Sequence, residues 1–112
     1  MVSEVPQKGD FIVVTFDPQS GHEQRGRRPA LVVSNTLFNR HTGLVIVCPI
    51  THTDRRFPFH VAVVNDPKVP GFIMAEQVKP LDYRARKAKR ISRASESVLS
   101  AVLSILDACL YE

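Results

Sequence analysis

One segment of the chain carries more reactive side chains than a connector between two strands requires. It lies between the apolar runs 11–16 and 30–33, and it holds His22, Glu23, Gln24, Arg25, Arg27 and Arg28. Gly21 and Gly26 free the backbone around these groups. Loops on a rigid sheet are where binding and catalytic groups concentrate. We therefore expect a functional hairpin loop, with a solvated polar loop as the alternative.

The basic residues are clustered, which favours a polyanionic partner. The formal net charge is +4. Basic side chains gather at 25–28 and 55–56, and the stretch 84–93 holds six of them without one acid. Most are arginine, whose planar fork suits phosphate. Basic patches on several loops fit a nucleic acid, although charge alone fits a solvated face equally well.

Length and composition indicate one globular domain spanning residues 1–112. The chain is 44% hydrophobic and 23% charged, and no apolar stretch approaches the length of a membrane span. The N-terminus lacks the features of a signal peptide, so we expect a cytoplasmic protein. Cys48 and Cys109 have no Cys-x-x-Cys neighbour, and we expect both to be reduced.

The apolar pattern predicts several short strands followed by one helix. Strands are expected over 9–16, 28–34, 44–50 and 57–64, with one or two more over 72–81 interrupted around Pro80. A turn or short helical turn is expected over 35–43, a loop over 65–71, and a helix over 92–110 capped by Ser92 or Ser95. This order favours a mainly β fold, a small antiparallel β-barrel with a C-terminal helix across it.

Other chemistries find little support in the sequence. His41, His52 and His60 lack the spacing of metal ligands, and no acid cluster suggests a two-metal nuclease. No Gly-rich phosphate loop and no Gly-x-Ser-x-Gly elbow is present. These observations favour chemistry without a metal or cofactor.

A series of motifs in a fixed order resembles the MazF/PemK (Kid) toxins. The series begins with Gly9-Asp10, Asp17-Pro18, Gly21-His22-Glu23-Gln24 and Gly26-Arg27-Arg28-Pro29. It continues with Pro49-Ile50-Thr51, Phe57-Pro58-Phe59, Glu76-Gln77-Val78-Lys79 and Tyr83-Arg84-Ala85-Arg86. The combination Gly-x-Glu-Gln-x-Gly-x-Arg-Pro with a downstream Pro-x-Thr is specific, and the resemblance covers nearly the whole chain.

The resemblance implies a toxin of a type II toxin–antitoxin module. Such proteins have a compact SH3-like β-barrel, form homodimers and cut single-stranded RNA at short motifs without a metal. The products are a 2′,3′-cyclic phosphate and a 5′-hydroxyl, and a cognate MazE-like antitoxin neutralises the enzyme. Two other functions remain open. One is a CcdB-like inhibitor of a topoisomerase, which shares the fold without being a nuclease. The other is an RNA-binding module that never cuts.

The resemblance also assigns catalytic roles. Arg28 matches the catalytic arginine, whose donors would hold a phosphorane, and Thr51 would hydrogen-bond the scissile phosphate. Glu23, His22 and Glu76 are the alternatives for the general base. The acid at the position of Glu76 has an arginine two residues earlier in Kid-like toxins. Here that position is Met74, which weakens the Kid-like scheme.

The remaining predicted site residues would bind RNA. Gln77 matches an amide that contacts RNA, and Phe57 is a candidate for stacking on an unpaired base. The basic side chains of Arg25, Arg27, Arg84, Arg86 and Lys87 would face phosphates. Phe16 and Phe38 are further stacking candidates, although for Phe16 we favour a place in the core.

Overall fold

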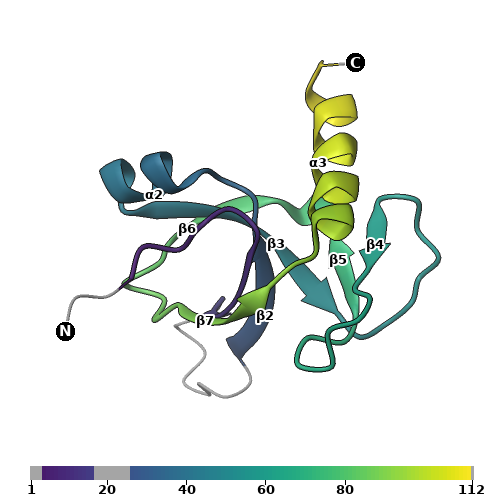
Figure 1. Cartoon of the computed structure of the whole chain (residues 1–112), viewed down its shortest axis with the longest axis horizontal. Coiled ribbons are helices and arrows are strands. Elements are labelled where there is room, and N and C mark those ends of the chain that lie inside the picture. Colours follow the sequence, from purple (N-terminus) through teal and green to yellow (C-terminus); the bar gives the residue numbers. More distant parts are fainter. Residues whose placement is uncertain (1–3, 17–25, 112) are drawn as a thin grey trace.

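An antiparallel sheet with a C-terminal helix dominates the computed structural model, which describes residues 4–16 and 26–111 (Figure 1). In chain order the strands and helices are β1 (Asp10–Thr15), β2 (Arg27–Val32), α2 (Thr36–Thr42), β3 (Leu44–Thr51), β4 (His60–Ala62), β5 (Phe72–Met74), the 3-10 turn η1 (Ala75–Gln77), β6 (Lys79–Asp82), β7 (Lys89–Arg93) and α3 (Glu96–Tyr111).

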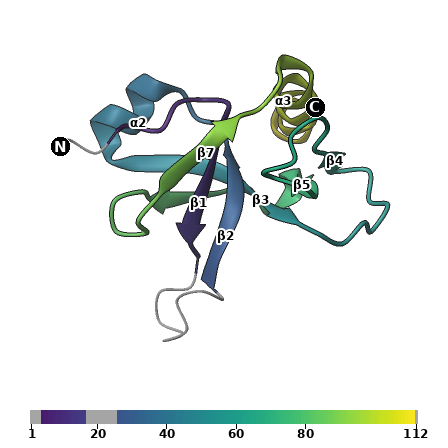
Figure 2. The ribbon, with the colours of Figure 1, turned by 60° about the horizontal axis from the view of Figure 1, so that its bottom comes forward.

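The strands follow the order β4-β5-β3-β2-β1-β7, and β6 pairs with the first half of β3. All the pairings are antiparallel. The sheet curves strongly and α3 stands at one side of it (Figures 1 and 2). The prediction of a mainly β, antiparallel fold with a C-terminal helix is therefore confirmed. In the described residues, however, β4 and β7 do not pair, so the strands do not close into a complete barrel.

Two apolar clusters form, one on each face of the central strands. Alternation along β1 sends Phe11 to one face and Ile12 to the other, and both side chains are 1% exposed. The first cluster joins the sheet to α3 through Leu31, Ile50, Ile73, Val98 and Val102. The second fills the inside of the curve with Val14, Ala30, Val32, Val45, Val47, Leu81 and Tyr83. Burial on both faces explains why these strands are continuous apolar runs in the sequence.

Local capping sets the ends of the helices. The Asn35 side chain accepts a hydrogen bond from Phe38 N at 2.7 Å and starts α2, which Gly43 ends with φ 73°. The predicted short helical turn over 35–43 is thus α2. Ser95 accepts from Val98 N at 3.3 Å at the start of α3, whereas Ser92 belongs to β7. Within the described ranges, no helix has the length and apolar character needed to cross a membrane.

Three sequence predictions differ from the structure. The fourth predicted strand, 57–64, is much shorter, because β4 covers only His60–Ala62. The chain breaks at η1 rather than at Pro80, which lies inside β6 opposite Ile46. The basic stretch contains β7, which no apolar pattern revealed because its side chains are mostly exposed.

Candidate functional site

Arg28 and Thr51 lie near the facing ends of the neighbouring strands β2 and β3. In the β2–β3 ladder Ala30 pairs with Pro49 and Leu31 with Cys48. This ladder ends at the pair of Ala30 and Pro49, and Arg28 on β2 and Thr51 on β3 each lie two residues beyond it. The two residues that the resemblance makes central therefore lie near the facing ends of two neighbouring strands.

The side chains of Arg28 and Thr51 differ in their exposure to solvent. Arg28 is exposed, whereas Thr51 is only 8% exposed. Thr53 N donates to Thr51 Oγ1 at 3.2 Å, which leaves the Thr51 hydroxyl proton available for another acceptor. Gly71 lies directly against this residue, since a Cβ at position 71 would come within 2.5 Å of the Thr51 carbonyl oxygen. Thr51 is thus buried against Gly71, while Arg28 is exposed to solvent.

An aromatic ring and a lysine share the same face of the sheet. Arg28 pairs with Val14, so Phe16, two residues further along, follows the same side of the chain. Lys79 pairs with Val47 on β3, and its Nζ lies 4.9 Å from the centre of the Phe16 ring. Phe16 is half-buried and packs against the second apolar cluster, as predicted, yet its ring also supports a cation. Lys79 was not among the predicted site residues.

Glu76 and Gln77 form the turn η1, where Glu76 has a partner that the sequence did not indicate. His60 Nε2 lies 3.0 Å from Glu76 Oε2, and the two side chains are 4% and 27% exposed. His60 stands opposite Met74 in the β4–β5 ladder. In Kid-like toxins an arginine at the position of Met74 would lie beside this acid. Here the nitrogen beside Glu76 comes from His60, on the neighbouring strand β4. Its other ring nitrogen, Nδ1, is buried and has no hydrogen-bond partner among the described residues.

Two exposed aromatic rings pack in series against His60. Phe57 meets the His60 ring edge to face at 5.2 Å, and Phe59 meets Phe57 in the same way at 5.3 Å. Phe57 is 43% exposed, so its ring remains open to a ligand. Phe38, the other stacking candidate, is 36% exposed and lies on α2.

Cys48 lies near the Glu76 carboxylate and is inert. Burial, and then the negative charge of Glu76, raise the pKa of the Cys48 thiol to about 12. The thiol is therefore protonated at neutral pH. Since the thiolate is the nucleophile, Cys48 supplies no nucleophilic catalysis.

Two of the predicted RNA-binding arginines are used within the chain. Arg27 donates to Thr15 Oγ1 at 3.0 Å and to the Lys87 carbonyl oxygen at 2.9 Å. Arg86 donates to the carbonyl oxygens of Thr15, at 3.2 Å, and of Phe16. Together they fasten the loop between β6 and β7 to the hairpin end of β1 and β2. Contact of either guanidinium with RNA stays a prediction.

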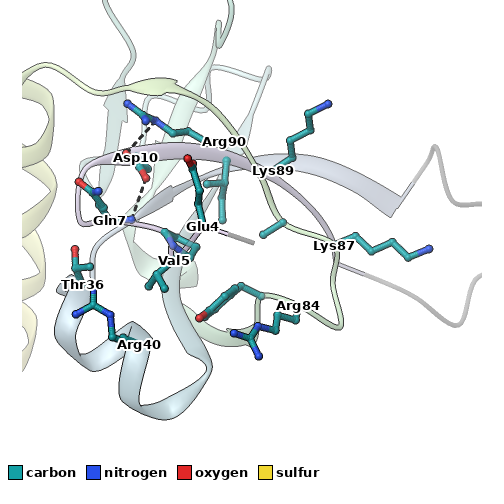
Figure 3. Close-up of a pocket in the computed structure, with 14 residues that line it drawn as sticks. Glu4, Val5, Gln7, Asp10, Thr36, Arg40, Arg84, Lys87, Lys89 and Arg90 are labelled. Atoms are coloured by element: carbon teal, nitrogen blue, oxygen red, sulfur yellow. Dashed lines mark hydrogen bonds and ion pairs between the residues drawn. The ribbon is translucent and has the colours of Figure 1, made fainter. Parts of the chain in front are cut away.

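Arg84 and Lys87 lie at a separate cavity (Figure 3). This cavity is bounded by residues 4–7, α2, the loop between β6 and β7, and β7. Arg28, Thr51, Phe16 and Lys79 do not line it. Of the predicted basic residues that the structure describes, Arg84 and Lys87 line this cavity, whereas the Arg27 and Arg86 side chains bind backbone carbonyl groups.

Three predicted residues, His22, Glu23 and Arg25, lie outside the described residues. In the part of the chain that the structure describes, no group of three His, Cys, Asp or Glu side chains gathers as metal ligands would. The contacts of His60 with Glu76 and of Lys79 with Phe16 were not predicted from the sequence. Both contacts depend on strand register. The order of the motifs was the only feature of the sequence that related to them.

Fold and site together define a small antiparallel β protein whose cationic sheet end suits a phosphate-containing polymer. Comparison with known proteins makes the class specific. The family model of PemK-like, MazF-like toxins of type II toxin–antitoxin systems matches residues 7–110. The chain therefore belongs to this family, and the resemblance found in the sequence is confirmed.

Individual relatives agree with this assignment. The endoribonuclease toxin MazF of Escherichia coli K12 is 43% identical over 91 residues, covering 80% of this chain and 81% of the relative. The endoribonuclease toxin ChpB of the same organism is 39% identical over 110 residues, covering 91% of each. The crystal structure of MazF from Deinococcus radiodurans has a TM-score of 0.87 at 38% identity, covering 98% of this chain and 100% of that one. A MazE–MazF complex from that organism has a TM-score of 0.85 at 33% identity, covering 96% and 97%.

Proposed function

We propose that this protein is an endoribonuclease toxin that cuts single-stranded RNA at a short sequence motif without a metal ion. The observation that carries the proposal is that Arg28 and Thr51 lie near the facing ends of the neighbouring strands β2 and β3, each two residues beyond the last pair of their ladder. The relatives at 43% and 39% identity are endoribonuclease toxins, and they support it. They do not favour the CcdB-like alternative.

The reaction is a transesterification within the RNA chain. The 2′-oxygen attacks phosphorus and forms the cyclic phosphate, while the bond from phosphorus to the 5′-oxygen breaks. A base takes the 2′-proton and an acid gives a proton to the leaving oxygen. Arg28 donates to the phosphoryl oxygens, where negative charge increases in the transition state. Thr51 donates its free hydroxyl proton to the same phosphate, because its oxygen is already bound to Thr53 N.

Proton transfer requires a base within reach, and Glu76 is the described candidate beside Glu23 and His22. The Glu76 carboxylate is 27% exposed, so it is open to substrate on one side and bound by His60 on the other. His60 is too deeply buried to contact RNA. We propose that His60 orients Glu76, in the role that an arginine at position 74 would have had.

RNA binding would use the groups around this centre. Gln77 follows Glu76 in η1, and its amide can donate to or accept from a base edge. Phe57 offers an exposed ring for stacking. Arg84, Lys87 and Arg25 would bind phosphates, which determines affinity more than sequence choice.

The same proposal includes partners and location. Solved relatives include MazE–MazF complexes, which supports a MazE-like antitoxin as the inhibitor of this toxin. We also propose a homodimer acting in the cytoplasm. A monomeric mass by light scattering at micromolar concentration would contradict the dimer.

Chemistry and cleavage motif can be tested in one experiment. Purified protein is incubated with long RNA in excess EDTA, and the 5′ ends of the fragments are sequenced. We expect cuts at one short motif, with 5′-hydroxyl and 2′,3′-cyclic phosphate termini. RNA that is bound but stays intact, with and without divalent metal, would favour the module that never cuts.

A further inference from the structure

The ammonium of Lys79 lies over an aromatic ring beside the second apolar cluster. Its Nζ is 4.9 Å from the centre of the Phe16 ring, and Lys79 is exposed to solvent. A cation within about 6 Å of a ring centre is attracted by the negative face of the ring. Nothing in the reaction described above uses this contact, although it favours one position for a positive charge at the surface.

Strand alternation places Lys79 and Arg28 on the same side of the sheet. Lys79 lies two residues before Leu81 on β6. Arg28 likewise lies two residues before Ala30 on β2. Leu81 and Ala30 both belong to the second apolar cluster, against which Phe16 also packs. Because residues two apart on a strand project from one face, both cations follow the side of the sheet that carries this cluster.

Phe16 is also a neighbour of Arg28. The Phe16 backbone N–H donates to the Gly26 carbonyl oxygen at 2.8 Å, which extends the β1–β2 pairing. Arg28 pairs with Val14, two residues before Phe16, so Arg28 and Phe16 are diagonal neighbours. Such positions are about 7–8 Å apart, within reach of aromatic and long side chains. The Phe16 ring thus has two cations as neighbours, Arg28 diagonally across the strands and Lys79 over its face.

The contact with the ring leaves Lys79 able to bind an anion. The ring attracts the charge of the ammonium without accepting conventional hydrogen bonds, so its three N–H donors stay available. No described carboxylate forms an ion pair with Lys79. The ring also restricts a flexible four-carbon side chain, and less rotamer entropy is then lost when an anion binds. Lys79 is therefore a preorganised cation whose supporting ring neighbours Arg28.

An RNA strand bound at Arg28 presents more than one phosphate to this side of the sheet. Phosphates follow one another along the strand, one per nucleotide, so the cleaved phosphate has a neighbour on each side. We propose that Lys79 binds one of these neighbouring phosphates, and that Phe16 positions the Lys79 ammonium for this contact. The inference rests on the proposed function, because it takes RNA as the ligand.

This assignment separates the roles of two aromatic candidates for stacking. The Phe16 ring is half-buried and has Lys79 over it, so it holds a cation rather than a base. The Phe57 ring is 43% exposed and open to a base. Lys79 takes no part in proton transfer, and its contact with a phosphate contributes to affinity rather than to the choice of base.

Binding is tested with a strand that cannot be cut. A labelled single-stranded 2′-O-methyl RNA of mixed sequence lacks the attacking hydroxyl, and its affinity is measured by fluorescence anisotropy at several salt concentrations. We expect Lys79→Gln to weaken binding about tenfold and to lower the slope of log Kd against log salt by about 0.7, as for one phosphate contact on a single strand. The matched control Lys68→Gln removes an equal charge from an exposed loop and should change neither. Unchanged affinity and slope for Lys79→Gln would overturn the inference.

The role of Phe16 is tested through Lys79. Phe16→Leu keeps an apolar side chain but removes the ring face, and it should weaken binding about threefold. Phe16→Tyr keeps the ring and should bind like the wild type. The double variant Phe16→Leu/Lys79→Gln should bind no more weakly than Lys79→Gln alone, because Phe16 acts through the lysine. Additive losses would show that Phe16 contacts the RNA itself and would overturn its positioning role.

The position of the phosphate is tested by cleavage. Two RNA substrates each carry one uncharged methylphosphonate, in place of the phosphate on one or the other side of the cleaved bond. On unmodified RNA, Lys79→Gln should lower kcat/KM about tenfold through KM, with kcat unchanged. On one of the two modified substrates the variant and the wild type should cut equally well, since the partner of Lys79 is already gone. A tenfold difference on both modified substrates would overturn the assignment.

The inference and the proposed function can fail separately. Failure of the wild type to cut any RNA would contradict the proposed function, while the anisotropy measurement would still test whether Lys79 binds a phosphate. Cleavage by the wild type, with unchanged RNA binding by Lys79→Gln, would overturn only the role given to Lys79.

Discussion

Arg27 binds the Lys87 carbonyl oxygen at 2.9 Å, and this contact fixes the loop after β6 to the strand that carries Arg28. Neighbouring arginines in β2 thereby have different roles. The Arg27 guanidinium donates hydrogen bonds to two groups of the chain itself, Thr15 Oγ1 and the Lys87 carbonyl oxygen. Arg28, one residue later, stays exposed at the end of the sheet. Alternation along a strand thus gives two neighbouring arginines different surroundings, one bound to the chain itself and the other exposed to solvent.

The two arginines should separate stability from activity. Arg27→Ala should lower the free energy of unfolding by about 1–3 kcal/mol, because it removes several partly buried hydrogen bonds. Arg28→Ala should change it by less than about 0.5 kcal/mol, since the side chain is exposed. Urea denaturation of the two variants measures the difference. Equal stability of both variants would contradict the role given to Arg27.

Gly71 should be essential for the position of Thr51. A Cβ there would lie 2.5 Å from the Thr51 carbonyl oxygen, and φ is +137°, so Gly71→Ala should destabilise the fold by more than about 3 kcal/mol. Gly43→Ala is the matched control. That glycine has φ +73°, but no described atom lies within 4 Å of a Cβ at this position, so the cost should be about 1 kcal/mol. Similar denaturation midpoints for the two variants would show that the contact with Thr51 is unimportant.

Cys48 should make the protein less stable in alkali. Its pKa is raised from 9.0 to about 12 in the folded chain, so above pH 9 only the unfolded state releases the proton. As the pH rises between these two pKa values, the contribution of the Cys48 thiol to the free energy of unfolding should fall by about 1.4 kcal/mol per pH unit. Urea denaturation at several pH values measures the dependence of the free energy of unfolding on pH. The Cys48→Ala variant should lack the part of this dependence that comes from the thiol.

The same burial predicts the labelling of the thiols. Cys48 is fully buried and Cys109 is exposed. A thiol reagent should modify the native protein at Cys109 alone and the denatured protein at both residues. Mass spectrometry after proteolysis identifies the labelled sites. Rapid labelling of Cys48 in the native protein would contradict its burial.

The pair of His60 and Glu76 should act as one unit in catalysis. If Glu76 moves the proton, Glu76→Gln should lower kcat by about 100-fold or more with little change in KM. His60→Phe should have a smaller effect of the same kind, and His60→Gln, which can still donate to Glu76, should restore much of the rate. The double variant Glu76→Gln/His60→Phe should be no worse than Glu76→Gln. Independent, additive losses would show that His60 does not act through Glu76, and a normal kcat for Glu76→Gln would leave Glu23 and His22 as the bases.

Much of this fold could be predicted because the central strands are buried on both faces. The runs at 11–16, 28–34 and 44–50 became β1, β2 and β3, and the periodic segment at the C-terminus became α3. The strand β7 could not be predicted in this way. Its residues are mostly exposed, so charge rather than apolar alternation dominates its sequence.

The sequence motifs nominate the site residues, whose roles stay predictions, but the contacts between side chains could not be predicted. Arg28, Thr51 and Gln77 were proposed from the motifs, and the structure places Arg28 and Thr51 near the facing ends of β2 and β3. The contact of His60 with Glu76 depends on the register of β4 and β5, and that of Lys79 with Phe16 depends on how β6 meets the end of β1. Long-range register leaves no local trace in a sequence, so these contacts had to come from the structure.

The central claim is that Arg28 and Thr51 together cleave RNA without a metal. Its most direct test is the cleavage rate of wild type, Arg28→Ala, Thr51→Ala and the control Lys68→Ala on one RNA in excess EDTA. We predict that Arg28→Ala lowers kcat/KM about 100-fold or more and Thr51→Ala about tenfold to 100-fold, while Lys68→Ala cuts at the wild-type rate. Wild-type rates in both Arg28→Ala and Thr51→Ala would contradict the account.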